Sequence, residues 1–231
     1  MASCVIMQPT YMPWAGYFNL LTMADHFVFY DDADFSKGSW HNRNRLISNG
    51  EPLWLTVPVY QHLHQKITDV TPIYSSCWKE KHVKTIRNIY ARHEFFYDLN
   101  PVVDILSSLS DESLAEINIK IIQFFIKALD ITCTVQRSSR LMVGGGRSDK
   151  LHAMCRELNC ETYISPAGAM EYIESDAVLK SNGIEVIYQK FTPAVYKQKC
   201  DTFIPYMSII DVVACIGLDA CKKYIRGGYE I

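Results

Sequence analysis

The chain has 231 residues, of which 48% are hydrophobic and 21% are charged, and its formal net charge is −2. Such a composition is typical of a globular protein with one sizeable core. The near-neutral, well-mixed charge argues against a large nucleic-acid footprint, although a local basic strip around Arg43 and Arg45 is compatible with it. No apolar run is long enough for a membrane span or a signal peptide, so we expect a cytoplasmic protein.

The eight cysteines are scattered through expected strands and helices, without a Cys-x-x-Cys pair. Cys155 and Cys160, five positions apart, are more typical of small buried thiols than of zinc ligands. His62 and His64 are two positions apart, but two histidines alone do not define a metal site. We therefore predict no metal.

The first expected element is an apolar strand at residues 5–8, which runs into a proline-containing turn and a helix over residues 13–24. A turn between a first parallel strand and a helix is where open α/β sheets bind anionic ligands. Gly16 lets a ligand approach the backbone, and the rings of Trp14 and Tyr17 can stack on a planar group. An aromatic staple that closes the helix over the sheet explains the same rings. The substrate-binding candidates in this segment are Gln8, Tyr11, Trp14, Gly16 and Tyr17.

The second expected strand, residues 26–31, ends in three acidic residues, Asp31, Asp32 and Asp34. Carboxylates this close repel one another unless a cation, an amine or a basic partner lies among them. A solvated loop that caps the next segment is the alternative interpretation, because aspartate is common in turns.

Hydrogen-bond donors and an aromatic ring crowd the next nine positions, beginning at Lys37. Arginine offers a planar fork that matches phosphate or carboxylate, and tryptophan offers a stacking face, so these residues beside the acids suggest a polar, bifunctional substrate. If residues 40–45 form a strand, only one of its faces can line the site. One face carries the candidates Trp40, Asn42 and Asn44, and the other carries His41, Arg43 and Arg45.

An antiparallel excursion follows, with short strands expected at residues 46–47, 53–60 and 66–73 and a turn at Asn49 and Gly50. We expect residues 46–75 to form a flap beside the site.

Residues 76–130 are expected to form a helical insertion, with helices over residues 76–92, 100–109 and 111–129 and with Ser110 as the cap of the last. On its first helix the substrate-binding candidates Lys81, His82 and Lys84 lie within little more than one turn, where two lysines on one face can hold a diphosphate. A solvated charged surface explains these residues equally well.

The rest of the chain alternates strands with helices. Strands are expected at residues 131–136, 162–165 and 184–189, and helices at residues 148–158, 169–181 and 208–225. The whole pattern predicts a single α/β domain over residues 1–231, built on a Rossmann-like open sheet of about five parallel strands with the antiparallel excursion and the helical insertion.

Two later turns carry glycine. Residues 144–146 precede a helix with Ser148 as the expected cap and offer a plausible anion nest, without the spacing of a phosphate-binding P-loop. Ser165 and Gly168, two further substrate-binding candidates, lie in a turn between another strand and helix. In a doubly wound sheet these turns converge with the opening turn on one crevice.

Segments across nearly the whole chain resemble the WbqC-like protein family. They are residues 8–18, 27–32, 35–45, 54–59, 78–86 with Tyr90, 144–148, 162–169 and 203–211. The resemblance implies a connection with surface-polysaccharide biosynthesis, such as that of O-antigen.

A weaker likeness concerns mechanism. Pro9 and Thr10, followed by residues 14–17, look like a degenerate form of the His-x-Gly-His signature of the nucleotidylyltransferase superfamily, whose two histidines bind triphosphate during adenylyl transfer. The likeness makes ATP a candidate cofactor. Trp14 and Tyr17 stand in place of the histidines, however, and this departure puts ATP-dependent chemistry in doubt.

The family resemblance implies a sugar and the superfamily likeness implies a nucleotide step. With the polar groups that follow the strand ends, they favour an enzyme of nucleotide-sugar or surface-polysaccharide biosynthesis that transfers an aminoacyl-type acyl group to an amino sugar, with or without a preceding adenylation. Its partner is expected to be a nucleotide sugar or an activated amino acid, and neither a membrane nor a nucleic acid. Asp31 or Asp32 would orient the amine or accept its proton, and Lys37 with the arginines would hold phosphate or carboxylate, so the catalytic candidates are Asp31, Asp32 and Lys37. The alternative is a non-catalytic nucleotide- or sugar-binding protein.

Overall fold

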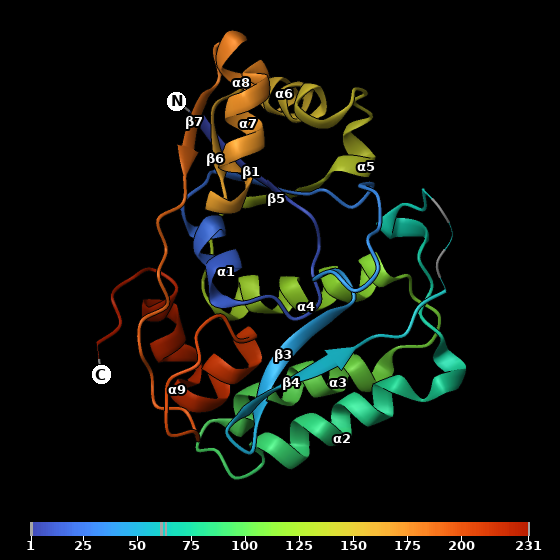
Figure 1. The fold of residues 1–231 in the computed structure, drawn as a ribbon, viewed down its shortest axis with the longest axis vertical. Helices are drawn as coiled ribbons and strands as arrows, with labels where there is room; N and C mark the ends of the chain where they lie inside the picture. The colour runs from blue at the N-terminus through green and yellow to red at the C-terminus, as the bar shows by residue number, and fades with distance from the viewer. Residues whose placement is uncertain (1, 61, 63, 231) are drawn as a thin grey trace.

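The computed structural model describes residues 2–60, 62 and 64–230, and only the backbone of Arg147. Five parallel strands form its central sheet in the order β5-β2-β1-β6-β7, with helices on both faces (Figure 1). The expected open sheet of five parallel strands is confirmed. The strands are β1 (Ala2–Met7), β2 (His26–Phe29), β5 (Thr134–Arg137), β6 (Cys160–Ser165) and β7 (Glu185–Tyr188).

The strand order places a switch point between β1 and β6. From β1 the chain continues to β2 and β5 on one side, and it then crosses to β6 and β7 on the other side. Ligands of open α/β sheets bind outside the carboxyl ends of the strands at such a point.

Helices and a separate hairpin complete the described part of the chain. The hairpin pairs β3 (Arg43–Ser48) with β4 (Glu51–Thr56) across the predicted turn at Asn49 and Gly50. It lies across α4 from the central sheet, near α2 and α3 (Figure 1). Within the described residues, no helix combines the length and the apolar character that a membrane crossing requires. The helices are α1 (Ala15–Thr22), α2 (Trp78–Tyr90), α3 (Asn100–Ser108), α4 (Leu114–Ala128), α5 (Ser138–Leu141), α6 (Arg147–Glu157), α7 (Met170–Asp176), α8 (Val178–Ser181) and α9 (Ile209–Tyr224).

The two faces of the sheet bury different hydrophobic clusters, because successive strand side chains point to opposite faces. Val5 and Phe27 belong to the larger cluster, which includes residues of α1, α4 and α9. Cys4 and Val28 belong to the smaller cluster, which α6, α7 and α8 cover. Burial on both faces explains why these strands read as continuous apolar runs.

The prediction of a third antiparallel strand over residues 66–73 is wrong. The segment contains a 3-10 helix, Ile67–Asp69, and pairs with other residues only through isolated bridges, at Lys66 and at Pro72. Ile67 and Val70 are both buried, and a spacing of three residues suits a helical turn rather than a strand. Pro72 has no N–H to donate to a strand ladder. Residues 61 and 63 of the expected flap lie outside the described residues.

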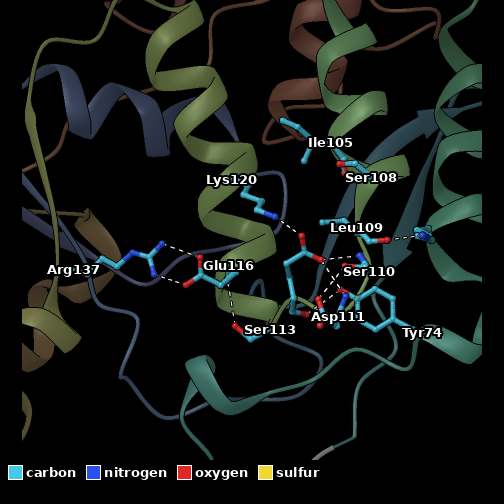
Figure 2. Close-up of polar contacts among 12 residues, drawn as sticks. Tyr74, Ile105, Ser108, Leu109, Ser110, Asp111, Ser113, Glu116, Lys120 and Arg137 are labelled. Atoms are coloured by element: carbon cyan, nitrogen blue, oxygen red, sulfur yellow. Dashed lines mark hydrogen bonds and ion pairs between the residues drawn. The ribbon is translucent and has the colours of Figure 1, made fainter.

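The start of α4 also differs from the prediction, which placed the cap at Ser110. Figure 2 shows that Ser113 is the cap, because its hydroxyl accepts a hydrogen bond from the backbone N–H of Glu116 at 3.4 Å. The Glu116 carboxylate instead receives both arms of the Arg137 guanidinium, which ties α4 to the end of β5. The backbone N–H of Ser110 donates to Glu112, so Ser110 belongs to the preceding turn.

Two predictions about the helices on either side of β6 are wrong, one about a helix and one about a cap. The helix expected over residues 169–181 is broken between α7 and α8, where Ala177 has a left-handed φ of 51°. Ser148, the expected cap of α6, instead donates a hydrogen bond from its hydroxyl to Asp176 at the end of α7. Gly146 occupies the cap position of α6 without a side-chain hydrogen bond.

Candidate functional site

A cleft of about 750 Å³ opens at the switch point of the sheet. It brings together the turn after β1, the acidic segment after β2, the turn after β6 and one residue of α6. The sequence predicted that the opening turn, the acidic segment and the turn after β6 converge, and residues of all three line the cleft. The glycine turn at residues 144–146, which was expected in the same crevice, does not line it. The lining residues are Ile6, Met7, Gln8, Thr10, Tyr30, Ala33, Asp34, Ser36, Ser39, Trp40, His41, Leu151, Tyr163, Pro166, Ala169 and Tyr172.

Gln8 and His41 form a hydrogen-bonded pair in this cleft. The Nδ1 atom of His41 lies 3.3 Å from the backbone nitrogen of Ser36, and a backbone N–H only donates, so Nδ1 is unprotonated. The proton is therefore on Nε2, which donates to Oε1 of Gln8 at 3.0 Å. This bond fixes the Gln8 amide, and no acceptor for its NH₂ group is found among the described residues.

His41 is a positioning residue rather than a base. Burial lowers the pKa of His41 to about 4, so the imidazole is neutral near pH 7. Both of its nitrogens already have partners, and its side chain has no free lone pair to accept a proton.

Aromatic rings form much of the cleft wall. They are contributed by Tyr30 after β2, Trp40 before β3, Tyr163 on β6 and Tyr172 on α7. Burial raises the pKa of each of the three tyrosine hydroxyls, which therefore stay protonated and can donate. The ammonium of Lys150 lies 5.1 Å from the centre of the Tyr30 ring. Such a wall suits a ligand with a planar or ring-shaped group.

Asp31 and Asp32 are engaged with the protein. The buried Asp31 carboxylate accepts hydrogen bonds from the hydroxyl of Ser138 at 3.1 Å and from the backbone and hydroxyl of Ser139 at 3.0 and 2.8 Å. It thereby holds the start of α5. Asp32 pairs with Lys150 and accepts from Ser138. Burial opposes ionisation of Asp32, but these hydrogen bonds outweigh it and lower its pKa.

Asp34 is the acid of this segment that lines the cleft. Its carboxylate lies 2.6 Å from the ammonium of Lys66, and its side chain is 66% exposed. The hydrogen bond from Lys66 lowers the pKa of Asp34, so the carboxylate is ionised.

Trp14, Gly16 and Tyr17 do not line the cleft. The Trp14 ring packs against Phe191 and Tyr206, with ring centres 5.7 and 5.2 Å away. It also covers Gly16, where an added Cβ would lie 2.1 Å from the ring, so the group that approaches this glycine is Trp14 itself. Tyr17 is buried, and its hydroxyl donates to the carbonyl of Gln8 at 3.2 Å. The Tyr17 ring packs against Phe27 of β2, as closure of the helix over the sheet requires, whereas the Trp14 ring packs on residues outside the sheet.

The buried amides of Asn42 and Asn44 hold loops in place. The Asn42 nitrogen donates to the carbonyl of Val57 at 2.9 Å, and the Asn44 nitrogen donates to the carbonyls of Tyr11 and Met12 at 3.1 and 2.8 Å. Both side chains are almost fully buried. Neither amide faces the cleft.

A third buried amide joins the two loops that carry the polar pair. Asn118 on α4 donates to the carbonyl of Pro9 at 3.0 Å and to the carbonyl of His41 at 2.8 Å. Its own Oδ1 is buried and has no partner in the described part of the chain. One side chain therefore anchors both the turn after β1 and the segment before β3.

The candidates on α2 lie apart from the cleft. His82 is buried, and its Nδ1 lies 2.8 Å from the Tyr11 hydroxyl, so this pair belongs to the core. Lys81 donates to the carbonyl of Ser76 at 2.9 Å. Lys84 lines a separate groove of about 390 Å³ on α2 and α3.

The remaining candidates border the cleft or are exposed. Arg43 and Arg45 do not line it, but Arg45 lies 5.6 Å from the ring of Trp40, which does. Lys37 is exposed. Ser165 is buried at the end of β6, and Gly168 is exposed, while Pro166 and Ala169 of the same turn line the cleft.

No metal cluster is found among the described residues, where no three or more His, Cys, Asp or Glu side chains gather to hold an ion. The eight cysteines are free thiols, and Cys155 and Cys160 are buried as expected.

Sequence reasoning missed several cleft residues. Tyr163 and Tyr172 were not singled out, because a tyrosine in a strand or on a short helix reads as a packing residue. Thr10, Ser36 and Ser39 were also missed, since small polar residues in loops are common. Their positions just after β1 and β2 were the available signal.

An open parallel sheet with a ligand-sized cleft at its switch point defines a Rossmann-like α/β protein. The chain belongs to the WbqC-like protein family, which matches residues 8–223. It is also similar to an uncharacterized protein of Mycobacterium tuberculosis, with 28% identity over 230 residues that cover 98% of each chain. The resemblance seen in the sequence is thereby confirmed.

Proposed function

We propose that the cleft is the active site of an enzyme of polysaccharide biosynthesis that transfers an aminoacyl-type acyl group to the amine of an amino sugar. The observation that carries this proposal is the cleft itself. Its walls carry aromatic rings, and it contains the oriented amide of Gln8 and the carboxylate of Asp34. The family is associated with polysaccharide biosynthesis in general, which supports a sugar as the ligand.

The size and lining of the cleft suit such a substrate. Small-molecule sites generally measure about 300–1,000 Å³, and this cleft measures about 750 Å³. Tyrosine and tryptophan rings stack on sugar faces and nucleobases, while their polar edges donate hydrogen bonds. Thr10, Ser36 and Ser39 add hydroxyl groups for the polar side of the ligand.

Asp34 would receive the amine. Its carboxylate already holds a primary ammonium, that of Lys66, and an amino-sugar amine that takes this place is held by the same charge. The bound ammonium first loses one proton to solvent, because only the neutral NH₂ form has a lone pair to react. Its nitrogen then bonds to the acyl carbonyl carbon, and the bond from that carbon to its leaving group breaks, so that the leaving group departs with the electron pair. Because the pKa of Asp34 is low, Asp34 takes the proton only after the new bond has made the nitrogen acidic.

Gln8 would stabilise the charge that develops on the acyl oxygen. Its Oε1 accepts from His41, so its NH₂ group is turned toward a ligand acceptor. A donor held in place before the reaction stabilises an oxyanion without reorganisation.

The acyl donor is expected to arrive already activated. Trp14 and Tyr17, which stand where the nucleotidylyltransferase superfamily has its histidines, pack away from the cleft. Within the described cleft lining there is no lysine or arginine to hold a triphosphate.

The test incubates the purified protein with amino-sugar nucleotides and a glycyl thioester, in parallel with glycine and ATP, and measures amide product by mass spectrometry. We expect Asp34→Asn and Gln8→Leu each to lower the rate by about a hundredfold, the scale of acid–base and oxyanion contributions. Asp219→Asn, an exposed carboxylate on α9 outside the cleft, is the matched control and should leave the rate unchanged. Absence of amide with every donor would refute the proposal.

A non-catalytic binding protein is the second candidate. The neutral, doubly occupied His41 and the ionised Asp34 favour it, because neither is a strong base. Calorimetry that detects sugar-nucleotide binding without turnover, unchanged by Asp34→Asn, would select this alternative.

A further inference from the structure

One face of the β3–β4 hairpin carries an exposed cluster of two arginines and two tryptophans. The antiparallel register places Arg45 opposite Trp54, and Arg43 lies two residues from Arg45 and so on the same face. Trp40, just before β3, completes the set. We call these four residues the arginine–tryptophan cluster.

The rings hold the guanidinium groups in stacked positions. The Arg43 guanidinium lies 4.3 Å from the centre of the Trp54 ring, and that of Arg45 lies 5.6 Å from the rings of both tryptophans. The two rings are 5.4 Å apart. Although they are large and apolar, Trp40 and Trp54 are 47% and 42% exposed. Stacking uses the faces of the guanidinium groups and leaves their hydrogen-bonding edges open.

The donors of these arginines lack acceptors within the described residues. Neither arginine makes an ion pair there, the Nε atoms of both are buried without a partner, and Arg45 makes a single long hydrogen bond of 3.5 Å to the carbonyl of Tyr206. By contrast, Arg137 forms a two-armed pair with Glu116, and Arg226 donates to three carbonyl oxygens. The half-buried Arg137 and the exposed Arg226 thus have acceptors for their donors, whereas Arg43 and Arg45 have few.

We propose that the arginine–tryptophan cluster binds an anionic group, a phosphate or a carboxylate, of the ligand whose sugar lies in the cleft. Trp40 belongs to both sites, which makes them continuous. Each guanidinium presents five N–H donors in a fork that matches the oxygens of such a group. The inference rests on the proposed function for the sugar, and it defines the substrate class as an anionic sugar.

Two sources supply this chemistry, the diphosphate of a nucleotide sugar and the carboxylate of an acidic sugar. Uridine diphosphate and inorganic pyrophosphate probe the first source, and glucuronate probes the second, with glucose as the uncharged reference. Binding is measured by calorimetry and by tryptophan fluorescence, to which Trp40 and Trp54 contribute two of the four tryptophans of the chain. The anion that binds identifies the source.

The variants are Arg43→Gln and Arg45→Gln, each expected to weaken binding of that anion at least about tenfold, as loss of a charge-assisted pair does. Trp54→Leu should weaken binding less, because the charge remains and only its support is lost. The matched control is Arg92→Gln, an exposed arginine beyond the end of α2, which should bind as the wild type does. Melting temperatures check that each variant is folded.

Several outcomes overturn the inference. They are the absence of binding by all three anions to the wild type, and equal binding by the cluster variants and the Arg92→Gln control. No acyl donor is present in these measurements, so they are independent of turnover. Arginine-dependent binding in a protein that forms no amide supports the cluster and contradicts the transfer reaction alone.

Discussion

The contact between Gly16 and Trp14 provides a sharp test of how α1 is packed. An alanine Cβ at position 16 would lie 2.1 Å from two atoms of the Trp14 ring, well inside the contact distance of about 3.5–4.0 Å, so the ring must move away. Its two aromatic contacts, with Phe191 and Tyr206, are each worth about 0.5–1.5 kcal/mol. Alanine returns about 1 kcal/mol through its helix propensity, while strain from overpacking costs about 1–3 kcal/mol. The net loss is therefore about 3 kcal/mol at the midpoints of these ranges.

We expect Gly16→Ala to lower the melting temperature by about 6–12 °C, at about 2–4 °C per kcal/mol for a chain of this size. Urea unfolding of Gly16→Ala, Trp14→Ala and the double variant completes the test. Once the ring is absent, alanine at position 16 should be neutral or stabilising, since only the helix propensity remains. If Gly16→Ala costs the same free energy in both backgrounds, or nothing in the wild type, the explanation is wrong.

Three further predictions concern stability. The pKa values of His41 and His82 are lowered by burial to about 4 from 6.5, so the unfolded chain binds more protons between these values and stability should fall as the pH drops from 6.5 to 4. Urea unfolding at several pH values in this range should show that the free energy of unfolding depends less steeply on pH in His82→Gln than in the wild type. An equally steep dependence on pH would contradict a lowered pKa of His82. Tyr196→Phe removes a 2.7 Å hydrogen bond to the buried Asp211 and should cost about 1–3 kcal/mol in denaturant unfolding, against which an unaltered midpoint would count. Arg137→Lys keeps the charge but loses the two-armed pair with α4 and should cost about 1 kcal/mol in thermal melts, whereas a wild-type melting temperature would show that the fork is unimportant.

The fold could be predicted from the sequence because its signals are local and repeated. A strand buried on both faces leaves a continuous apolar run, as at Val5 and Phe27, and helices between such runs imply parallel pairing. The prediction failed over residues 66–73. Ile67 and Val70 are β-branched residues, which favour a strand, but their spacing of three residues suits a helical turn. Ala177 gave no warning of the break between α7 and α8, because alanine rarely adopts positive φ.

The site was predictable by segment but not by side chain. The topology of the sheet decides where turns converge, and the turns were visible in the sequence. Which side chains face the cleft depends on contacts between distant segments. The amide groups of Asn42 and Asn44 could donate hydrogen bonds to a substrate, but in the structure they donate to backbone carbonyls of loops instead. Asp31, the first acid after β2, is taken by the start of α5, and this leaves the third acid, Asp34, to face the cleft.

Asn118 links the packing of α4 to the position of a residue in the cleft. Asn118 does not itself line the cleft, yet its amide nitrogen fixes the carbonyls of Pro9 and of the cleft residue His41, and these loops set where Gln8 stands. The position of the Gln8 amide thus depends on a buried residue of α4. Substitutions around Asn118 that are selected or designed to stabilise α4 would therefore also change the affinity for a ligand in the cleft.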